Sequence, residues 1–220
     1  PHQIWFMVRI FCKNTGTYKE FLEGTPLLDI APAFEFDKPY DILAAKVNNV
    51  AEGLRFRVFH NRDVEFLDYR TYIGRSFYSR SLCFLLYKAT RDLFPESRMT
   101  IRRPISKGYF CSVYKNDGSF MTEEDVESIG ARMRELVSEN IPFRRKELQI
   151  EEAIRIFKES GDLDKVKLLE TCGEVYITCY SLGDVTDYYY DELVPSTGYL
   201  KTFGVKLCHG GILLRVPDRH

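Results

Sequence analysis

The sequence lacks the charge excess, the long apolar runs and the signal segments that mark several classes of protein. Its 31 Lys and Arg residues nearly balance its 32 Asp and Glu residues, so the formal net charge is -1. With this balance no overall field draws the chain toward nucleic acid or a membrane surface, and tRNA is not expected as a partner. No apolar run reaches the roughly 18 residues of a membrane span, and no signal peptide is evident, so no membrane association is expected.

Motifs for disulfides and nucleotide binding are missing as well. The six cysteines are scattered without a C-x-x-C pair, which in a chain of 220 residues favours reduced, mostly buried thiols in the cytoplasm. No G-x-x-x-x-G-K-[ST] loop is present to bind the phosphates of ATP. What is present is a composition of 45% hydrophobic and 14% aromatic residues, which is typical of a well-packed globular protein.

Short elements are predicted in the first 68 residues. Lys13-Asn14-Thr15-Gly16 is a turn signal between two strands, and Thr25-Pro26 provides an N-cap followed by proline at the first helical position. Met7 is expected to be the physiological start, with residues 1–6 an extension. The expected elements are strands over 7–12 and 17–22, a short helix over 27–34, strands over 44–47, 54–59 and 64–67, and then a linker over 69–77.

Longer helices are predicted in the rest of the chain. Apolar residues recur at three- and four-residue spacings over 78–94 and predict a helix with one buried face, which Pro95 ends. Thr122-Glu123-Glu124-Asp125 is a capping-box variant that begins a second long helix, which breaks at Ile141-Pro142-Phe143. Two shorter helices over 150–159 and 163–169 follow. Strands are expected at 101 and 109–114, and a second sheet segment is expected from 175–180, 201–205 and 212–216, which together make an α+β domain.

Two sets of motifs resemble parts of one enzyme family. Lys46-Val47-Asn48 and Asp63-Val64-Glu65-Phe66-Leu67 resemble the TGS domain that begins threonyl-tRNA synthetases and some GTPases, over residues 7–68. Lys107-Gly108-Tyr109-Phe110 and Val194-Pro195-Ser196-Thr197-Gly198 resemble the editing-type domain shared by threonyl- and alanyl-tRNA synthetases, over residues 78–216. The implied fold class is α+β, with a β-grasp, ubiquitin-like TGS domain followed by an editing-like α+β domain.

The resemblance places four metal or catalytic ligands where this chain has none. In the editing family a helix carries H-x-x-x-H and a later loop supplies Cys and His. The matching positions here are Arg80, Phe84, Tyr189 and Leu193. Arg cannot become a ligand, and Phe and Leu have no donor atom. No catalytic residue and no metal site is therefore expected, and the chain itself is not expected to be an enzyme.

Other side chains near these positions remain candidates for binding. Asp187, with the acids that follow it, could bind a hard cation, although acids beside a run of tyrosines usually lie in a solvated loop. The tyrosines themselves are either core residues or rings on which a nucleotide base could stack. The basic clusters Arg102-Arg103 and Arg144-Arg145-Lys146 are either solvated surface or phosphate contacts. The candidate ligand-binding residues are Arg80, Arg102, Arg103, Lys107, Tyr109, Asp187 and Tyr189.

A second resemblance extends over the same residues. Two motifs are similar to the N-terminal region of a bacterial uridine-kinase-like protein: Phe11-Cys12-Lys13-Asn14-Thr15-Gly16, and the segment from Asp187-Tyr188-Tyr189-Tyr190 through Tyr199. This resemblance implies a P-loop kinase domain beyond residue 220 as partner, with ATP and Mg needed only there. The chain would then be a regulatory or assembly region of a nucleoside kinase, binding a nucleotide-like effector, with homo-oligomers left open. The alternative is a free-standing synthetase-like module that binds tRNA or edits mischarged tRNA in trans.

Overall fold

The computed structural model describes residues 6–218, except for the side chains of residues 101–103. The expectation of an N-terminal extension therefore lies almost entirely outside the described residues. By internal contacts the chain forms two compact units, the first comprising residues up to 80 together with 192–195, and the second comprising 81–191 and 196–218. Both units combine helices and strands, so the α+β class is confirmed.

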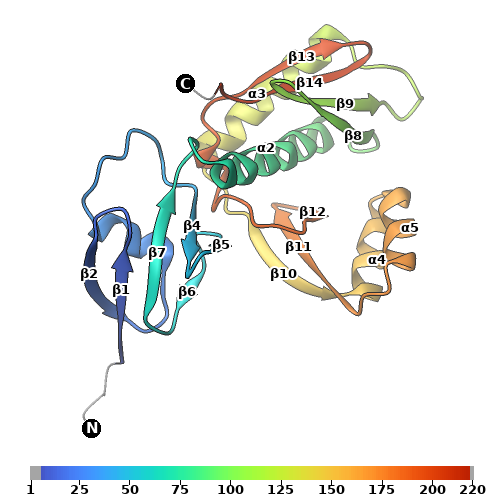
Figure 1. Cartoon of the computed structure of the whole chain (residues 1–220). Helices are drawn as coiled ribbons and strands as arrows, with labels where there is room; N and C mark the ends of the chain where they lie inside the picture. The colour runs from blue at the N-terminus through green and yellow to red at the C-terminus, as the bar shows by residue number, and fades with distance from the viewer. Residues whose placement is uncertain (1–5, 219–220) are drawn as a thin grey trace. The chain divides into compact units, whose positions relative to one another are not determined.

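The first unit is built on one mixed sheet (Figure 1). Its strand order is β2-β1-β7-β4-β5, in which β1 and β7 are parallel and the other pairs are antiparallel. Alternate residues of β1, such as Val8 and Ile10, are buried, as expected for a half-buried strand. The strands are β1 (Met7–Cys12), β2 (Thr17–Leu22), β4 (Ala44–Val47), β5 (Val50–Glu52) and β7 (Arg62–Leu67).

A short helical segment and a small two-stranded sheet complete the first unit. The expected helix over 27–34 is present as α1 (Leu27–Ile30) followed by the 3-10 turn η1 (Ala31–Ala33), and its N-cap is Pro26. The expected strand over 54–59 is mostly wrong. Only β6 (Arg57–Val58) is extended, pairing with β3 (Thr25–Pro26), because the Phe56 N–H donates to the Gly53 carbonyl in a tight turn.

The long helix α2 (Tyr72–Leu93) begins within the segment expected to be a linker. Its first turn is capped by Thr71, whose Oγ1 accepts a hydrogen bond from the Gly74 N–H at 3.0 Å. Gly74 is required there, because a Cβ would clash with the Asp68 carbonyl oxygen. Because glycine disfavours helix, Gly74 indicates a linker, and the sequence therefore predicts the helix only from residue 78.

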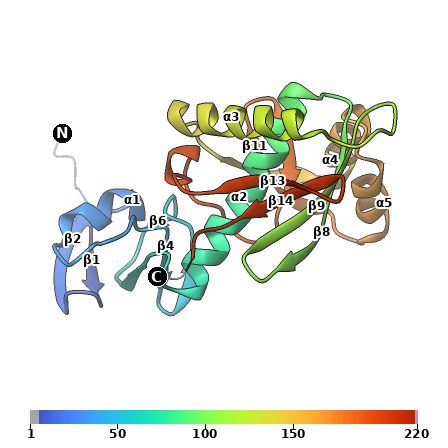
Figure 2. The ribbon, with the colours of Figure 1, turned by 90° about the horizontal axis from the view of Figure 1, so that it is seen from above.

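The second unit contains a four-stranded antiparallel sheet of order β13-β14-β9-β8. The helix α3 (Glu123–Glu139) packs along β13 (Figure 2). Its capping box is formed: Thr122 Oγ1 accepts from the Asp125 N–H at 3.1 Å, and Asp125 accepts from the Thr122 N–H at 2.9 Å. The strands are β8 (Arg98–Ile105), β9 (Gly108–Tyr114), β13 (Gly204–Cys208) and β14 (Gly211–Arg215).

A separate sheet of order β10-β11-β12 lies elsewhere in the same unit. Phe157 is fully buried in a cluster with Cys179 and Leu169, which joins the sheet to two helices. The sequence did not predict β10 or β12, and β11 does not share a sheet with β13 and β14 as expected. These elements are β10 (Arg144–Gln149), α4 (Ile150–Glu159), α5 (Leu163–Thr171), β11 (Tyr176–Leu182) and β12 (Val185–Tyr188), followed by the 3-10 turn η2 (Thr197–Tyr199).

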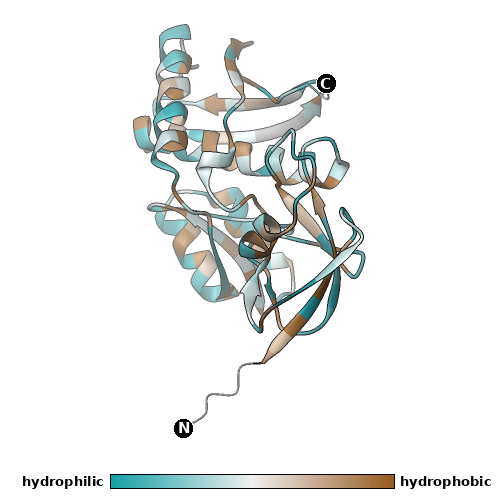
Figure 3. Cartoon of the chain, turned by 90° about the vertical axis from the view of Figure 1, so that its left-hand side faces the viewer, coloured by the Kyte–Doolittle hydropathy of each residue, from teal (hydrophilic) through white to brown (hydrophobic). Residues whose placement is uncertain are grey.

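Hydrophobic and hydrophilic residues are mixed within each helix and strand (Figure 3). Apolar and polar residues alternate around the helices, and β1, which follows the N-terminal trace, is largely apolar. No helix among the described residues is both long enough and apolar enough to cross a membrane.

Candidate functional site

Two of the four positions at which the resemblance expects ligands meet in the second unit as an aromatic cluster. Phe84, on α2, is fully buried, and its ring centroid lies 5.5 Å from that of Tyr189 and 5.7 Å from that of Phe143. Tyr189 follows β12 and also packs edge-on against Tyr180 at 6.3 Å. Burial, together with the neighbouring Asp187, raises the pKa of Tyr189 well above its ordinary value, so the phenol stays neutral. This cluster packs rings together and presents no set of metal donors.

The other two positions belong to the first unit, and they hold backbone in place. Arg80 Nη1 donates a hydrogen bond to the Glu192 carbonyl at 2.7 Å, and its guanidinium lies 5.8 Å from the Phe77 ring. Leu193, next to Glu192, is buried. Arg55 Nη2 donates to the Pro195 carbonyl at 2.9 Å in the same segment. Arg80 therefore anchors residues 192–195.

Asp187 forms a salt bridge in a largely buried setting. Its carboxylate lies 2.9 Å from Lys165 Nζ, and the Tyr188 N–H donates to it at 2.8 Å. The Asp187 side chain is only 13% exposed, so the expectation of a solvated acidic loop is wrong here. Burial raises the pKa of Asp187, while Lys165 opposes that shift. Because Lys165 satisfies this carboxylate, Asp187 is not an open ligand for a hard cation.

A second carboxylate, Asp162, joins α2 to the α4–α5 connection, and sequence reasoning missed it. The Tyr87 hydroxyl donates to Asp162 at 2.7 Å, Arg91 Nη2 donates at 2.9 Å, and Ser160 Oγ donates at 2.8 Å. Burial and this hydrogen bond raise the pKa of the Tyr87 hydroxyl. In the sequence, Asp162 follows Gly161 and looks like an ordinary polar loop residue. Its role is visible only once the fold brings Tyr87 and Arg91 to it.

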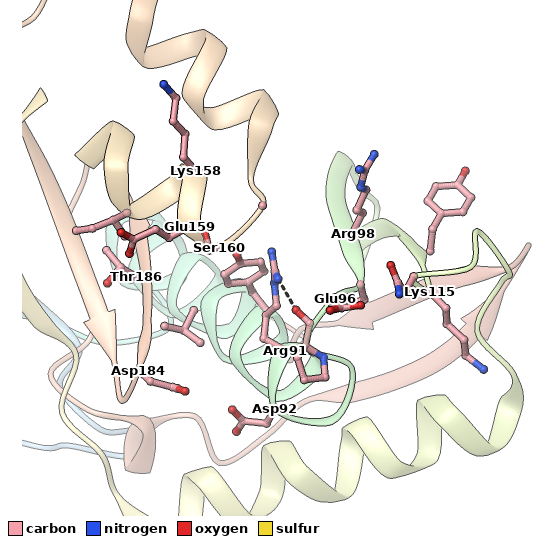
Figure 4. Close-up of a pocket in the computed structure, with 18 of the residues that line it drawn as sticks. Arg91, Asp92, Glu96, Arg98, Lys115, Lys158, Glu159, Ser160, Asp184 and Thr186 are labelled. Carbon is pink, nitrogen blue, oxygen red and sulfur yellow. Dashed lines mark hydrogen bonds between the residues drawn. The ribbon is translucent and has the colours of Figure 1, made fainter. Parts of the chain in front are cut away.

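A pocket of about 1080 Å³ opens beside this network in the second unit (Figure 4). Tyr87, Arg91 and Ser160 line it, and Arg91 Nη1 donates to the Pro95 carbonyl at 2.6 Å. Both acids and cations line the wall, so the pocket has no strong preference for a ligand of one sign. None of the described candidate residues from the sequence lines this pocket. The charged lining residues are Arg91, Asp92, Glu96, Arg98, Lys115, Asp117, Lys158, Glu159 and Asp184.

Two further candidates belong to the hairpin of β8 and β9. Lys107, at the turn between β8 and β9, is exposed and pairs with Asp218 at 3.4 Å, and Tyr109 is a half-buried residue of β9. The side chains of Arg102 and Arg103 lie outside the described residues. The tyrosine run divides sharply, because Tyr189 packs inward whereas Tyr190 is 94% exposed.

The motif residues 196–198 have a structural role at the end of α3. Asn140, in the left-handed region at φ 50°, accepts from Ser196 Oγ at 2.6 Å and from the Gly198 N–H at 3.1 Å. Thr197 Oγ1 donates to the Leu136 carbonyl at 2.6 Å and accepts from the Ile141 N–H at 2.8 Å. The motif thus satisfies backbone groups left unpaired where the helix ends. Within the part of the chain that the structure describes, no cluster of three or more His, Cys, Asp or Glu side chains could hold a metal ion.

Comparison with known proteins finds relatives that match most of the chain. No family model matches it. Threonine–tRNA ligase of Desulforamulus reducens is 32% identical over 197 residues, covering 89% of this chain and 31% of the ligase. The corresponding ligases of Syntrophomonas wolfei and Clostridium botulinum are 30% and 32% identical over 200 and 198 residues, covering 90% and 89% of this chain and 31% of each ligase. The chain therefore spans about a third of the length of the curated relatives it matches.

These relatives correct the kinase interpretation. About nine-tenths of the chain is homologous to threonine–tRNA ligases, so the expectation of a uridine kinase region is wrong. The expected kinase-domain partner, with its ATP and Mg, depended on that interpretation and is withdrawn with it. The expectation against tRNA, which depended on the net charge, is overturned by the same matches. The synthetase-like alternative fits the findings better.

Proposed function

We propose that this chain is a threonyl-tRNA-synthetase-type module that binds tRNA and does not hydrolyse mischarged tRNA. The observation that carries the proposal is the 32% identity to a threonine–tRNA ligase over 89% of the chain. The second part of the proposal, the loss of hydrolysis, is supported by the ring contact between Phe84 and Tyr189, which occupy two of the family's ligand positions.

We infer that the first unit is a β-grasp TGS domain and that the second is an editing-type domain. The central parallel pair β1 and β7, with a hairpin on one side and a short helix in the crossover, supports the β-grasp assignment. In this proposal the domains correspond to residues 7–68 and 78–216, with the start of α2 at Tyr72 replacing the expected linker.

The loss of hydrolysis follows from what the side chains now do. Phe84 has no donor atom, and Tyr189 is held neutral and packed against it. The Arg80 guanidinium donates a hydrogen bond to the Glu192 carbonyl, and Leu193 is buried. Activating a water molecule requires a base or a metal, and these four positions supply neither.

Binding of tRNA does not require the missing chemistry. Affinity for nucleic acid comes mainly from local cations that meet phosphates, so a net charge of -1 over the whole chain does not prevent it. Tyr190 offers a ring that is 94% exposed, and an exposed aromatic ring can stack on any unpaired base. The module is thus suited to hold tRNA without acting on its ester bond.

The proposal can be tested with the 220-residue chain and two forms of one RNA. Fluorescence anisotropy with a threonine-specific tRNA transcript measures binding, and the same tRNA carrying serine, which lacks only the methyl group of threonine, measures hydrolysis. We expect saturable binding at low salt, with seryl-tRNA decaying at its spontaneous rate. A failure to bind would contradict the tRNA part, whereas accelerated deacylation, with or without added Zn²⁺, would contradict the loss of hydrolysis.

A further inference from the structure

The hydroxyl of Ser97 is buried without a hydrogen-bond partner in the described part of the chain. Ser97 is only 3% exposed, and it lines the pocket that opens beside Asp162. Over residues 6–218, apart from the side chains of 101–103, Ser97 Oγ is the one buried side-chain oxygen or nitrogen that no protein group satisfies. Because leaving a buried polar group unpaired costs free energy, such groups are nearly always hydrogen-bonded. A ligand in this pocket is therefore able to supply the bond that the protein does not.

A tight turn places Glu96 and Ser97 directly after the end of α2. The Ser97 N–H donates to the Phe94 carbonyl at 3.0 Å, and Pro95 occupies the second position of the turn, where its fixed φ is favourable. The Pro95 carbonyl accepts a hydrogen bond from Arg91 Nη1 at 2.6 Å. Arg91 is thereby held against the same short turn that carries Glu96 and Ser97.

Arg91 is fixed in place and keeps hydrogen-bonding capacity. Its Nη2 donates to Asp162 at 2.9 Å, its guanidinium lies 5.5 Å from the Tyr87 ring, and its side chain is 14% exposed. A guanidinium has five N–H donors, of which two are used in the bonds to Asp162 and Pro95. Since Arg91 lines the pocket, its remaining donors are available to a carboxylate that enters there.

Glu96 gives the same turn a charge of the opposite sign. It is exposed on the pocket wall, and its carboxylate forms no salt bridge with any of the described side chains. Figure 4 shows Glu96 next to Arg91, with Lys158 and Glu159 across the pocket. Neither sign dominates the pocket as a whole, but here a base and an acid are neighbours. That arrangement suits a ligand whose own opposite charges are adjacent.

We propose that Arg91, Glu96 and Ser97 bind the head group of a free α-amino acid. Such a molecule carries an ammonium group and a carboxylate on one carbon atom, so it matches a neighbouring acid and base. Arg91 binds the carboxylate, Glu96 binds the ammonium group, and the Ser97 hydroxyl donates to a carboxylate oxygen. The pocket volume of about 1080 Å³ leaves room for any side chain. This site goes beyond the proposed binding of tRNA and does not depend on it.

The first test measures binding of each of the twenty protein amino acids to the 220-residue chain by isothermal titration calorimetry. For the amino acid that binds most tightly, two derivatives are measured as well: the N-acetyl form, which has no ammonium group, and the carboxamide, which has no carboxylate. We expect each derivative to bind at least roughly tenfold more weakly, because each loses a charge-assisted hydrogen bond. Absence of binding by all twenty, or derivatives that bind as well as the parent, would overturn the inference. The assay contains no RNA, so its result is separate from that of the tRNA experiment.

A charge-neutralising variant assigns the ammonium contact. Glu96→Gln is expected to weaken binding of the amino acid by roughly tenfold and to leave binding of the N-acetyl derivative unchanged. Glu159→Gln removes an exposed acid across the pocket, with the same change in net charge, and should keep the wild-type affinity. Equal losses in the two variants would overturn the assignment, because the overall field of the pocket would then account for binding.

Ser97→Ala distinguishes a contact with the ligand from a role in the fold. The substitution removes an unpaired buried hydroxyl, so urea unfolding should show a stability equal to or above that of the wild type. Affinity for the amino acid is expected to fall by roughly 2- to 10-fold, the effect of one neutral hydrogen bond. Lower stability with unchanged affinity would show that the hydroxyl serves the fold alone, and the inference would be overturned.

Discussion

Lys88 Nζ donates a hydrogen bond to Asp184 at 2.6 Å, and this contact ties α2 to the turn between β11 and β12. The Lys88 side chain is only 9% exposed, and Asp92, one helical turn further along, accepts a second bond from it at 2.7 Å. Burial lowers the pKa of Lys88, but the two carboxylates outweigh burial and the net shift is upward. The same contact lowers the pKa of Asp184.

Lys88→Met is expected to lower the free energy of unfolding by about 1–3 kcal/mol. It removes the cation from two carboxylates while keeping the length of the side chain, and Arg132 still neutralises Asp92. Urea unfolding at pH 7 measures the change. Lys167→Met, at an exposed position of α5, is the matched control. An equal, small effect of both substitutions would show that the Lys88 contacts add no stability beyond that of an exposed lysine.

Asp187→Asn is expected to flatten the pH dependence of stability. Because the folded-state pKa of Asp187 is raised, the folded protein binds more protons than the unfolded chain between the two pKa values. Its contribution is therefore fully present below the unfolded pKa of about 3.9 and is lost as the pH rises through the folded pKa. Urea midpoints from pH 4 to 8 measure this for the wild type and the variant. Glu170→Gln, on the exposed side of α5, should leave the slope unchanged, and parallel profiles for wild type and Asp187→Asn would refute the prediction.

Thiol reactivity is expected to divide the six cysteines into two classes. Burial raises the pKa of Cys111 and of Cys179 to about 12, so neither forms an appreciable amount of thiolate at pH 8. Cys12 and Cys83 are buried as well, and only Cys172 and Cys208 are partly exposed. Titration with an aromatic disulfide should detect no more than two rapidly reacting thiols in the folded chain and six in urea. Rapid reaction of Cys111 or Cys179 in the folded state would contradict the burial argument.

Tyr190→Ala is expected to weaken tRNA binding by about 1–3 kcal/mol, roughly 5- to 150-fold, with little change in stability. The ring is 94% exposed, and its ring contact is with Tyr188, at 6.3 Å, so removing it leaves no cavity in the core. Tyr190→Phe should retain the stacking, and Tyr72→Ala removes another exposed ring as a control. Anisotropy with the tRNA transcript and with the same transcript lacking its last four nucleotides measures the effect. We expect the ring to stack on a base of the unpaired 3′ end, so the loss should be confined to the complete transcript. Equal losses for both transcripts would refute this.

Features that depend on neighbours in the sequence could be predicted from the sequence. The capping box of Thr122 and Asp125 lies within one turn of helix, and the structure forms it as expected. The hairpin of β1 and β2 follows from the turn between them. The expectation of a single buried face on α2 is wrong, because residues 81–90 of this helix are buried on every side. The resemblance also identified the synthetase relatives, whereas its extension to a kinase was wrong, because a few short phrases are too little sequence to identify a family.

Features that depend on distant partners required the tertiary structure. β10 is a charged segment whose extended form depends on pairing with β11, some thirty residues later, and no local pattern specifies that pairing. Asp187 reads as a surface acid until Lys165, on α5, is brought within 2.9 Å of it. Phe84 and Tyr189, more than a hundred residues apart, make ring contact only because the fold joins α2 to the end of β12. The sequence by itself determined local features such as the capping box of Thr122 and the β1–β2 hairpin. Only the tertiary structure decided which groups are buried together, because burial and pairing are set by contacts between segments that the chain order keeps apart.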